Sequence, residues 1–229
     1  ELESVAAVIT DPPYSEHTHK SVRSAKMLAN DRGGKYGADV RRNVDLGFEH
    51  LTDELRVFCA EQFARLASRW VLVFSDVESD HLWRTDLQAN GLDYVRTGAW
   101  IKVGSTPQFS GDRPATGFEA ITICHPSGKK RWNGGGGHAV WSVPIVLDRG
   151  RNGSRQHPTQ KPVPLMQALV GLFSDEGETV LDPFAGSGTT LVVAKQLGRK
   201  SIGVERDERH CETIASRLAQ GALDFGGVA

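Results

Sequence analysis

A glycine-rich turn between an apolar strand and an apolar helix constrains this chain more than any other feature. An apolar run ends at Asp182-Pro183, Gly186 and Gly188 follow, and apolar residues at helical spacing then continue to Gly198. Glycine permits a tight turn and lets a ligand approach the backbone closely. The first turn of the helix presents free N–H groups and the positive end of the helix dipole to that ligand. The pattern predicts an α/β fold with a nucleotide-cofactor site at this turn.

The residues around the glycines narrow the choice of cofactor. Glu205 closes the next apolar run, about 20 residues beyond the glycines, which is the spacing of a carboxylate that binds ribose hydroxyls. A P-loop needs a lysine where Thr189 stands, and a dinucleotide loop needs a third glycine where Leu191 stands. ATP or GTP is therefore an unlikely cofactor, and NAD is a weak candidate. The third candidate is S-adenosylmethionine, which has no phosphate to bind. A turn that serves only strand-to-helix packing would leave Glu205 unexplained.

Three motifs resemble those of the DNA amino-methyltransferases. Residues 182–190, Asp-Pro-Phe-Ala-Gly-Ser-Gly-Thr-Thr, resemble the cofactor motif of that family. Residues 11–14, Asp-Pro-Pro-Tyr, resemble its catalytic motif, and residues 157–162, His-Pro-Thr-Gln-Lys-Pro, resemble a third motif. The catalytic motif comes first, which is the circularly permuted order of the β class. The resemblance implies a Rossmann-like S-adenosylmethionine-dependent methyltransferase fold, α/β, with a mostly parallel doubly wound sheet and an antiparallel strand.

The resemblance also implies roles for individual residues. The catalytic residues would be Asp11, Pro12, Pro13 and Tyr14. The residues that would bind S-adenosylmethionine are Asp182, Pro183, Phe184, Gly186, Ser187, Gly188, Thr189, Glu205, His157, Thr159 and Lys161. Among these, Lys161 would neutralise the carboxylate at the methionine end of the cofactor. No metal is required.

The implied reaction is site-specific transfer of a methyl group to the exocyclic N6 of a flipped adenine in DNA. That amine is a poor nucleophile, because its lone pair is delocalised into the ring. The Asp11 carboxylate and the Pro12 carbonyl would accept its protons, and Tyr14 would stack on the base, at about 1–3 kcal/mol. In the family, Asp at the first motif position accompanies mostly adenine. The alternatives are N4-cytosine methylation, an inactive DNA- and cofactor-binding scaffold subunit, an RNA or protein-glutamine methyltransferase and, distantly, an NAD-dependent enzyme.

Hydrophobic periodicity predicts the remaining elements. Buried strands are expected over residues 5–10, 70–74, 94–103 and 119–124, and helices over residues 53–67, 79–90, 162–173 and 207–220. The first strand delivers the catalytic turn to its carboxyl end, where open α/β sheets place their ligands. The faces expected to point inward consist of Leu55, Phe58, Cys59, Gln62, Phe63 and Leu66 in the first helix and Cys211, Ile214, Ala215 and Leu218 in the last. Asp76 either lines the base pocket or caps the helix that follows it.

Two basic segments are candidates for DNA contact. Residues 15–50 are expected to form a flexible basic loop beside the catalytic turn. Residues 126–156 are expected to form a short DNA-recognition insertion, in which Trp132 and Trp141 are interleaved with basic residues. The expected DNA-binding residues are Lys20, Arg23, Lys26, Arg113, Lys129, Lys130 and Arg131. An ordinary solvated loop is the alternative for each segment.

Length, charge and cysteine content limit the number of domains, the compartment and the kinds of partner that we expect. The length of 229 residues fits a single methyltransferase domain, 1–229, and the formal net charge of −1 makes any DNA surface a local patch. Three separated cysteines without metal-type pairing indicate a reducing compartment. Without an apolar run long enough for a membrane, we expect a cytoplasmic protein of bacterial or phage-encoded type, with DNA as partner and a homodimer as a further possibility. By the resemblance, a strand with another cofactor contact is expected ahead of Glu1.

Neutralising Lys20, Arg23 and Lys26 together is expected to weaken DNA binding and to reduce its salt dependence, because each phosphate contact releases condensed counterions. Affinity for duplex DNA, measured across a range of salt concentrations, checks this. Unchanged affinity together with an unchanged salt slope would show that this loop makes no phosphate contacts.

Overall fold

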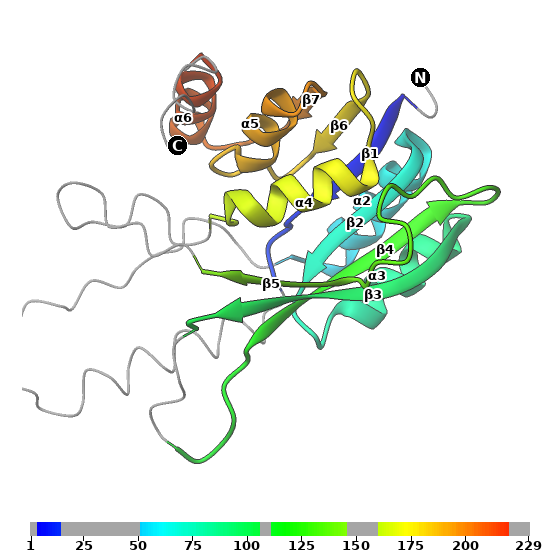
Figure 1. The fold of residues 1–229 in the computed structure, drawn as a ribbon. Coiled ribbons are helices and arrows are strands. Elements are labelled where there is room, and N and C mark those ends of the chain that lie inside the picture. Colours follow the sequence, from blue (N-terminus) through cyan, green and yellow to red (C-terminus); the bar gives the residue numbers. More distant parts are fainter. Residues whose placement is uncertain (1–3, 15–50, 106–110, 146–159, 220–229) are drawn as a thin grey trace, which may run out of the picture.

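The computed structural model describes residues 4–14, 51–105, 111–145 and 160–219 (Figure 1). These residues form a seven-stranded sheet with helices on both faces. The strands are β1 (Val5–Thr10), β2 (Ala67–Ser75), β3 (Leu92–Val103), β4 (Phe118–Pro126), β5 (Val140–Pro144), β6 (Thr179–Asp182) and β7 (Lys200–Gly203). The helices are α2 (Asp53–Leu66), α3 (Asp80–Ala89), α4 (Val163–Phe173), α5 (Thr189–Gln196) and α6 (Glu208–Ala219).

The sheet is mostly parallel. Its strand order is β5-β3-β4-β2-β1-β6-β7. β1 pairs in parallel with β2 and β6, β6 with β7, and β3 with β5, whereas β4 runs antiparallel to both β2 and β3. Every residue of β1 is buried, as expected of a parallel strand covered on both faces. The structure confirms the predicted sheet, including its antiparallel strand.

Two layers of helices enclose the sheet. On one face, Leu165, Leu169 and Phe173 of α4 and Val193 of α5 pack against the strands. On the other face, α2 and α3 contribute a second apolar cluster that includes Phe63. Figure 1 shows these two layers on either side of the strands. The doubly wound arrangement follows from the fully apolar central strands, which need cover on both sides.

The pairing of β1 with β6 brings together two segments that lie far apart in the sequence. Ala7 lies opposite Val180, and Val8 lies opposite Leu181. Because the two strands are parallel, their carboxyl ends reach the same edge of the sheet. The turn after β1 carries the predicted catalytic motif, and the turn after β6 carries the predicted cofactor motif, so both motifs lie at this edge.

Two helices bury less of their predicted inward faces than the sequence pattern indicates. α2 buries Cys59, Ala60 and Phe63, whereas the predicted inward residues Leu55 and Phe58 are exposed. α6 buries none of its residues. Cys59 and Phe63 were among the predicted inward residues, so the pattern identified the buried face of α2 but extended it too far. In α6, the predicted inward residues Ile214 and Leu218 are half-buried, because this helix packs at the margin of the fold, mainly against α5.

A short strand was missed within the basic segment 126–156. β5 pairs in parallel with β3, with Trp141 opposite Trp100. Trp141 is buried in the core, and the ring of Trp132 packs on Phe173 with 4.9 Å between centroids. Trp141 is therefore part of the core and Trp132 is half-buried, whereas contact between this segment and DNA stays a prediction. Residues 146–156 of the predicted insertion lie outside the described residues.

Replacing Gly188 with Ala is expected to destabilise the protein more than replacing Gly91 with Ala. Both glycines have positive φ, +77° and +87°, so both variants incur the left-handed penalty of about 1 kcal/mol. A Cβ at Gly188 would lie 2.7 Å from Ile214 of α6, whereas a Cβ at Gly91 would meet nothing within 4 Å. Crowding adds about 1–3 kcal/mol at Gly188 alone. Urea unfolding of both variants measures the difference, and equal losses would contradict the predicted contact.

Candidate active site

The turn after β1 places Asp11 beside a buried lysine. Lys161, just ahead of α4, donates a hydrogen bond from Nζ to Asp11 Oδ2 at 2.5 Å and lies 3.5 Å from the Tyr14 hydroxyl. Its side chain is 10% exposed. The sequence prediction assigned Lys161 to the methionine carboxylate of a cofactor, but the structure places its ammonium group against the predicted catalytic carboxylate.

The contact between Asp11 and Lys161 continues into a chain of four charged groups. Glu119 Oε2 lies 3.1 Å from Lys161 Nζ, and Glu119 Oε1 lies 2.6 Å from Lys102 Nζ. Glu119 comes from the start of β4 and Lys102 from the end of β3, which are antiparallel neighbours. The order Asp11–Lys161–Glu119–Lys102 alternates in sign, so the chain is neutral when all four groups are ionised.

Burial and this charge alternation set the pKa values in opposite directions. Burial raises the pKa of Asp11, and the Lys161 ammonium group opposes that rise. Burial also disfavours the ionised forms of Glu119 and Lys161, but their partners outweigh it: Lys161 and Lys102 lower the pKa of Glu119, and Asp11 and Glu119 raise the pKa of Lys161. Burial next to the two carboxylates raises the pKa of Tyr14 well above its usual value. Tyr14 is therefore a neutral phenol at physiological pH.

Asp11 retains one unused acceptor. Its Oδ1 is buried and has no hydrogen-bond partner within the described part of the chain. An unsatisfied buried acceptor costs about 1–3 kcal/mol. Such a group at the carboxyl edge of a parallel sheet indicates a site that is completed by a ligand donor.

The cofactor turn is organised by Asp182. Its Oδ1 accepts hydrogen bonds from the Thr10 hydroxyl at 2.9 Å and from the Phe184 backbone N–H at 3.2 Å, and its Oδ2 accepts one from the Thr190 hydroxyl at 2.6 Å. Burial raises the pKa of Asp182 to about 6, against these hydrogen bonds, which lower it. Asp182 thus joins β1, β6 and α5 at one buried point.

Glu205 follows the end of β7 and contacts the glycine turn. Its Oε2 accepts a hydrogen bond from Gly186 N–H at 2.9 Å, and its Oε1 accepts from Asp207 N–H, also at 2.9 Å. Ser187 and Thr189 are buried, and Arg217 of α6 donates a hydrogen bond to the Ser187 carbonyl. The glycine turn and the carboxylate therefore form one hydrogen-bonded unit, which places Glu205 beside the predicted cofactor loop.

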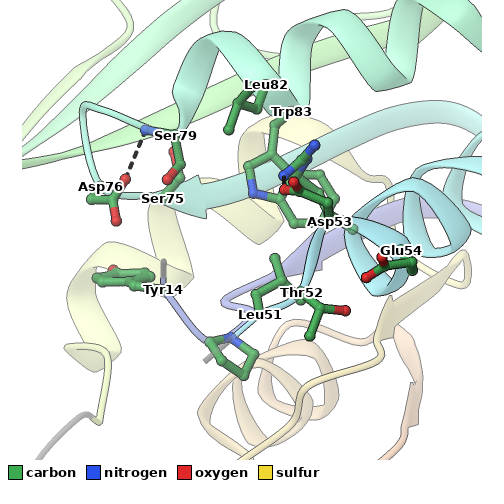
Figure 2. A pocket seen from close by; sticks show the side chains of 12 residues that line it. Tyr14, Leu51, Thr52, Asp53, Glu54, Ser75, Asp76, Ser79, Leu82 and Trp83 are labelled. Carbon is green, nitrogen blue, oxygen red and sulfur yellow. Dashed lines mark hydrogen bonds and ion pairs between the residues drawn. The ribbon is translucent and has the colours of Figure 1, made fainter. Parts of the chain in front are cut away.

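A hollow of about 330 Å³ opens beside the predicted catalytic turn, residues 11–14 (Figure 2). Its walls come from the catalytic turn, the first turn of α2 and the segment between β2 and α3; the lining residues are Pro13, Tyr14, Leu51, Thr52, Asp53, Glu54, Arg56, Ser75, Asp76, Ser79, Leu82 and Trp83. Asp76 Oδ1 accepts a hydrogen bond from Ser79 N–H at 2.7 Å, so Asp76 both stabilises the turn into α3 and lines this hollow. Asp76 is not the N-cap of α3, which is Ser79, and its contact with a base stays a prediction.

The predicted DNA-binding residues are scattered. Arg113 is exposed and pairs with Asp112. Lys129, Lys130 and Arg131 follow the end of β4, where Pro126 lies opposite Leu92, and the Arg131 carbonyl accepts a hydrogen bond from the Trp70 indole. This is the edge of the sheet opposite the catalytic turn, because β4 is antiparallel to β2. Lys130 pairs there with Asp93, and Arg131 with Asp175.

Other predicted residues cannot be placed. Lys20, Arg23, Lys26, His157 and Thr159 lie outside the described residues, as does the loop 15–50. Sequence reasoning did not assign Glu119 or Lys102 to the site. Two signals were present in the sequence: each is a charged residue in an otherwise apolar predicted strand, and both lie in a stretch, Trp100 to Glu119, that resembles part of the family.

Within the described ranges, no group of three or more His, Cys, Asp or Glu side chains is arranged to hold a metal ion. A search of the same ranges for an apolar helix long enough to cross a membrane also found none.

The architecture and the two adjacent motifs define an α/β methyltransferase fold. The M1.HpyAVI–SAM complex superposes with a TM-score of 0.64 at 22% identity, covering 94% of this chain and 89% of that chain. The cytosine-N4-specific PvuII DNA methyltransferase superposes with a TM-score of 0.68 at 15% identity, covering 99% and 82%.

The sequence matches the N6/N4 DNA methylase family model over residues 5–216, and the chain belongs to this family. The type II methyltransferase M.HinfI of Haemophilus influenzae is 26% identical over 238 residues, which cover 95% of this chain. The chain spans 64% of the length of M.HinfI.

Proposed function

We propose that this protein transfers a methyl group from S-adenosylmethionine to the exocyclic amino group of a base flipped out of DNA, and that the base is adenine. The observation that carries the proposal is the buried hydrogen bond from the Thr10 hydroxyl to Asp182, because it joins the end of the catalytic strand to the end of the cofactor strand. Family membership supports the reaction class.

The residues of the glycine turn fit the cofactor. Asp182 to Thr189 supply a turn in which Gly186 and Gly188 have positive φ, and Glu205 lies against it as an acceptor for ribose hydroxyls. S-adenosylmethionine, when bound, supplies an electrophilic methyl group: the nitrogen–carbon bond forms as the carbon–sulfur bond breaks, the sulfonium becomes a neutral thioether, and the nitrogen then releases a proton. We include His157 and Thr159 among the proposed cofactor-binding residues, because they belong to the motif 157–162.

Asp11 is the group that would act on the amine. Its unpartnered Oδ1 is a buried acceptor, and an exocyclic N–H is a donor of the required kind. A hydrogen bond to a carboxylate, together with one to the Pro12 carbonyl, favours a pyramidal nitrogen whose lone pair is available for attack. Fixed acceptors of this kind contribute by orientation and electrostatics, with no covalent bond between enzyme and base.

The hollow beside Tyr14 suits the extruded base. Its volume of about 330 Å³ lies at the lower end of the range for small-molecule sites, about 300–1,000 Å³. Tyr14 supplies an aromatic ring for stacking, and Asp76 and Ser79 supply polar atoms for base edges. Extruded bases are recognised in this way, by stacking and by contacts to their Watson–Crick edge.

Cytosine N4 is the second candidate target. The resemblance of the tetrapeptide 11–14 favours adenine, whereas the PvuII enzyme of similar fold is cytosine-N4-specific. The two amines present the same donors to Asp11, so the choice depends on the rest of the base pocket. Incubating the protein with methyl-labelled S-adenosylmethionine and unmodified DNA, followed by nucleoside analysis, distinguishes N6-methyl-2′-deoxyadenosine from N4-methyl-2′-deoxycytidine.

Replacing Asp11 with Ala is expected to lower methyl transfer to DNA by at least about 100-fold, because the amine loses its fixed acceptor. Affinity for S-adenosylmethionine, measured by calorimetry, is expected to stay unchanged, because Asp182 and Glu205 remain in place. Replacing the exposed Glu61 of α2 with Ala is the control for removing an acidic residue. Normal turnover by the Asp11 variant would remove this assignment.

A further inference from the structure

We propose that Lys161 and Glu119 are positioning residues that hold the Asp11 carboxylate in place with one oxygen free, and that Lys161 serves Asp11 rather than the cofactor. This inference rests on the proposed function and deepens it. It concerns how the amine acceptor is held, which the motif 11–14 alone does not explain.

The first observation is that the two carboxylate oxygens of Asp11 have different surroundings. Lys161 holds Oδ2 at 2.5 Å, while Oδ1 is buried without a partner in the described residues. A carboxylate free to rotate would exchange its two oxygens. A short charge-assisted hydrogen bond to one oxygen stops that exchange and leaves the other directed at the incoming donor.

The second observation is that Lys161 is itself fixed. Its ammonium group lies 4.9 Å from the ring centroid of Phe74, 5.7 Å from that of Trp100 and 5.8 Å from that of Tyr14. Glu119 closes the remaining side at 3.1 Å. Aromatic faces and a second carboxylate stabilise a desolvated cation in one position. Lys161 is thus already engaged by two carboxylates and three aromatic faces without a cofactor.

The third observation concerns Glu119, which has no expected contact with base or cofactor. Lys102 holds its Oε1 at 2.6 Å, so Glu119 is anchored from β3 while it contacts Lys161. Among the described residues, the charged and titratable groups around Asp11 are Lys161 ahead of α4, Glu119 on β4, Tyr14 on its own turn and Asp182 on β6, with Lys102 one step further away. Lys161 is the cation in direct contact with Asp11, and Glu119 restrains that cation.

Lys161 and Glu119 shift the pKa of Asp11 in opposite directions. This difference distinguishes a positioning role from a general loss of structure in the variants. Lys161 favours the ionised form of Asp11, and Glu119 disfavours it. Removing the cation should therefore raise the pKa of Asp11, and removing the Glu119 charge should lower it. A merely structural lesion would not produce this pair of opposite shifts.

The test uses Lys161→Met and Glu119→Gln in the whole protein, labelled with carbon-13 at aspartate carboxyls. The Asp11 signal is assigned by its loss in Asp11→Asn, and its pKa is read from an NMR titration. Glu178→Gln is the matched control, because Glu178 pairs with the buried Arg69 at 2.5 Å, at the opposite edge of the sheet. We expect the Asp11 pKa to rise in Lys161→Met, to fall in Glu119→Gln and to stay unchanged in the control.

Turnover and cofactor affinity complete the test. Both site variants are expected to lose kcat on the order of tenfold to a hundredfold, because the acceptor is no longer aligned, with an unchanged Kd for S-adenosylmethionine. A loss of S-adenosylmethionine affinity in Lys161→Met, or an Asp11 pKa that moves in neither variant, would overturn the inference. If the unmodified protein transfers no methyl group to DNA, the proposed function fails, but the titration still decides the roles of Lys161 and Glu119.

Discussion

The parallel pairing of β1 with β6 is the constraint on which the rest of this structure depends. It brings Thr10 and Asp182, 172 residues apart in the chain, within hydrogen-bond distance inside the sheet. The carboxyl group of Asp182 is buried, and donors from β1, the turn after β6 and α5 satisfy it. An Asp at this position without those donors would cost about 1–3 kcal/mol for each unsatisfied oxygen. Fold and site are therefore stabilised by the same contacts.

The four charged residues of the site differ from Asp182, because burying their ionised groups costs free energy. Each buried ion costs several kcal/mol before its partners compensate, and apolar residues of similar volume often give equal or greater stability. The chain Asp11–Lys161–Glu119–Lys102 is neutral, and its members are held at 2.5 to 3.1 Å. Stability alone gives little reason to build it. Its place beside the unpartnered oxygen of Asp11 makes it part of the site.

Most of the fold could be predicted from the sequence. The apolar strands, the glycine turn and the catalytic turn are short, local patterns, and each formed where its pattern predicted. The extent of the buried helix faces was less predictable: Phe58 of α2 belongs to an apolar stripe that the core does not reach, and α6 packs at the margin of the fold with no residue buried. β5 was missed because it is short and lies in a basic, glycine-rich segment, where only its pairing with β3 defines it.

The sequence by itself determined which chemical groups are present: an acceptor turn at Asp11, a glycine turn preceded by Asp182, and a carboxylate at Glu205. These depend on residue type and near spacing, which local backbone preferences translate directly into turns and helix starts. Only the tertiary structure decided which of those groups meet. Lys161 contacts Asp11 from 150 residues away, and Lys129 to Arg131 lie at the opposite edge, because strand direction and register, not local sequence, set long-range contacts.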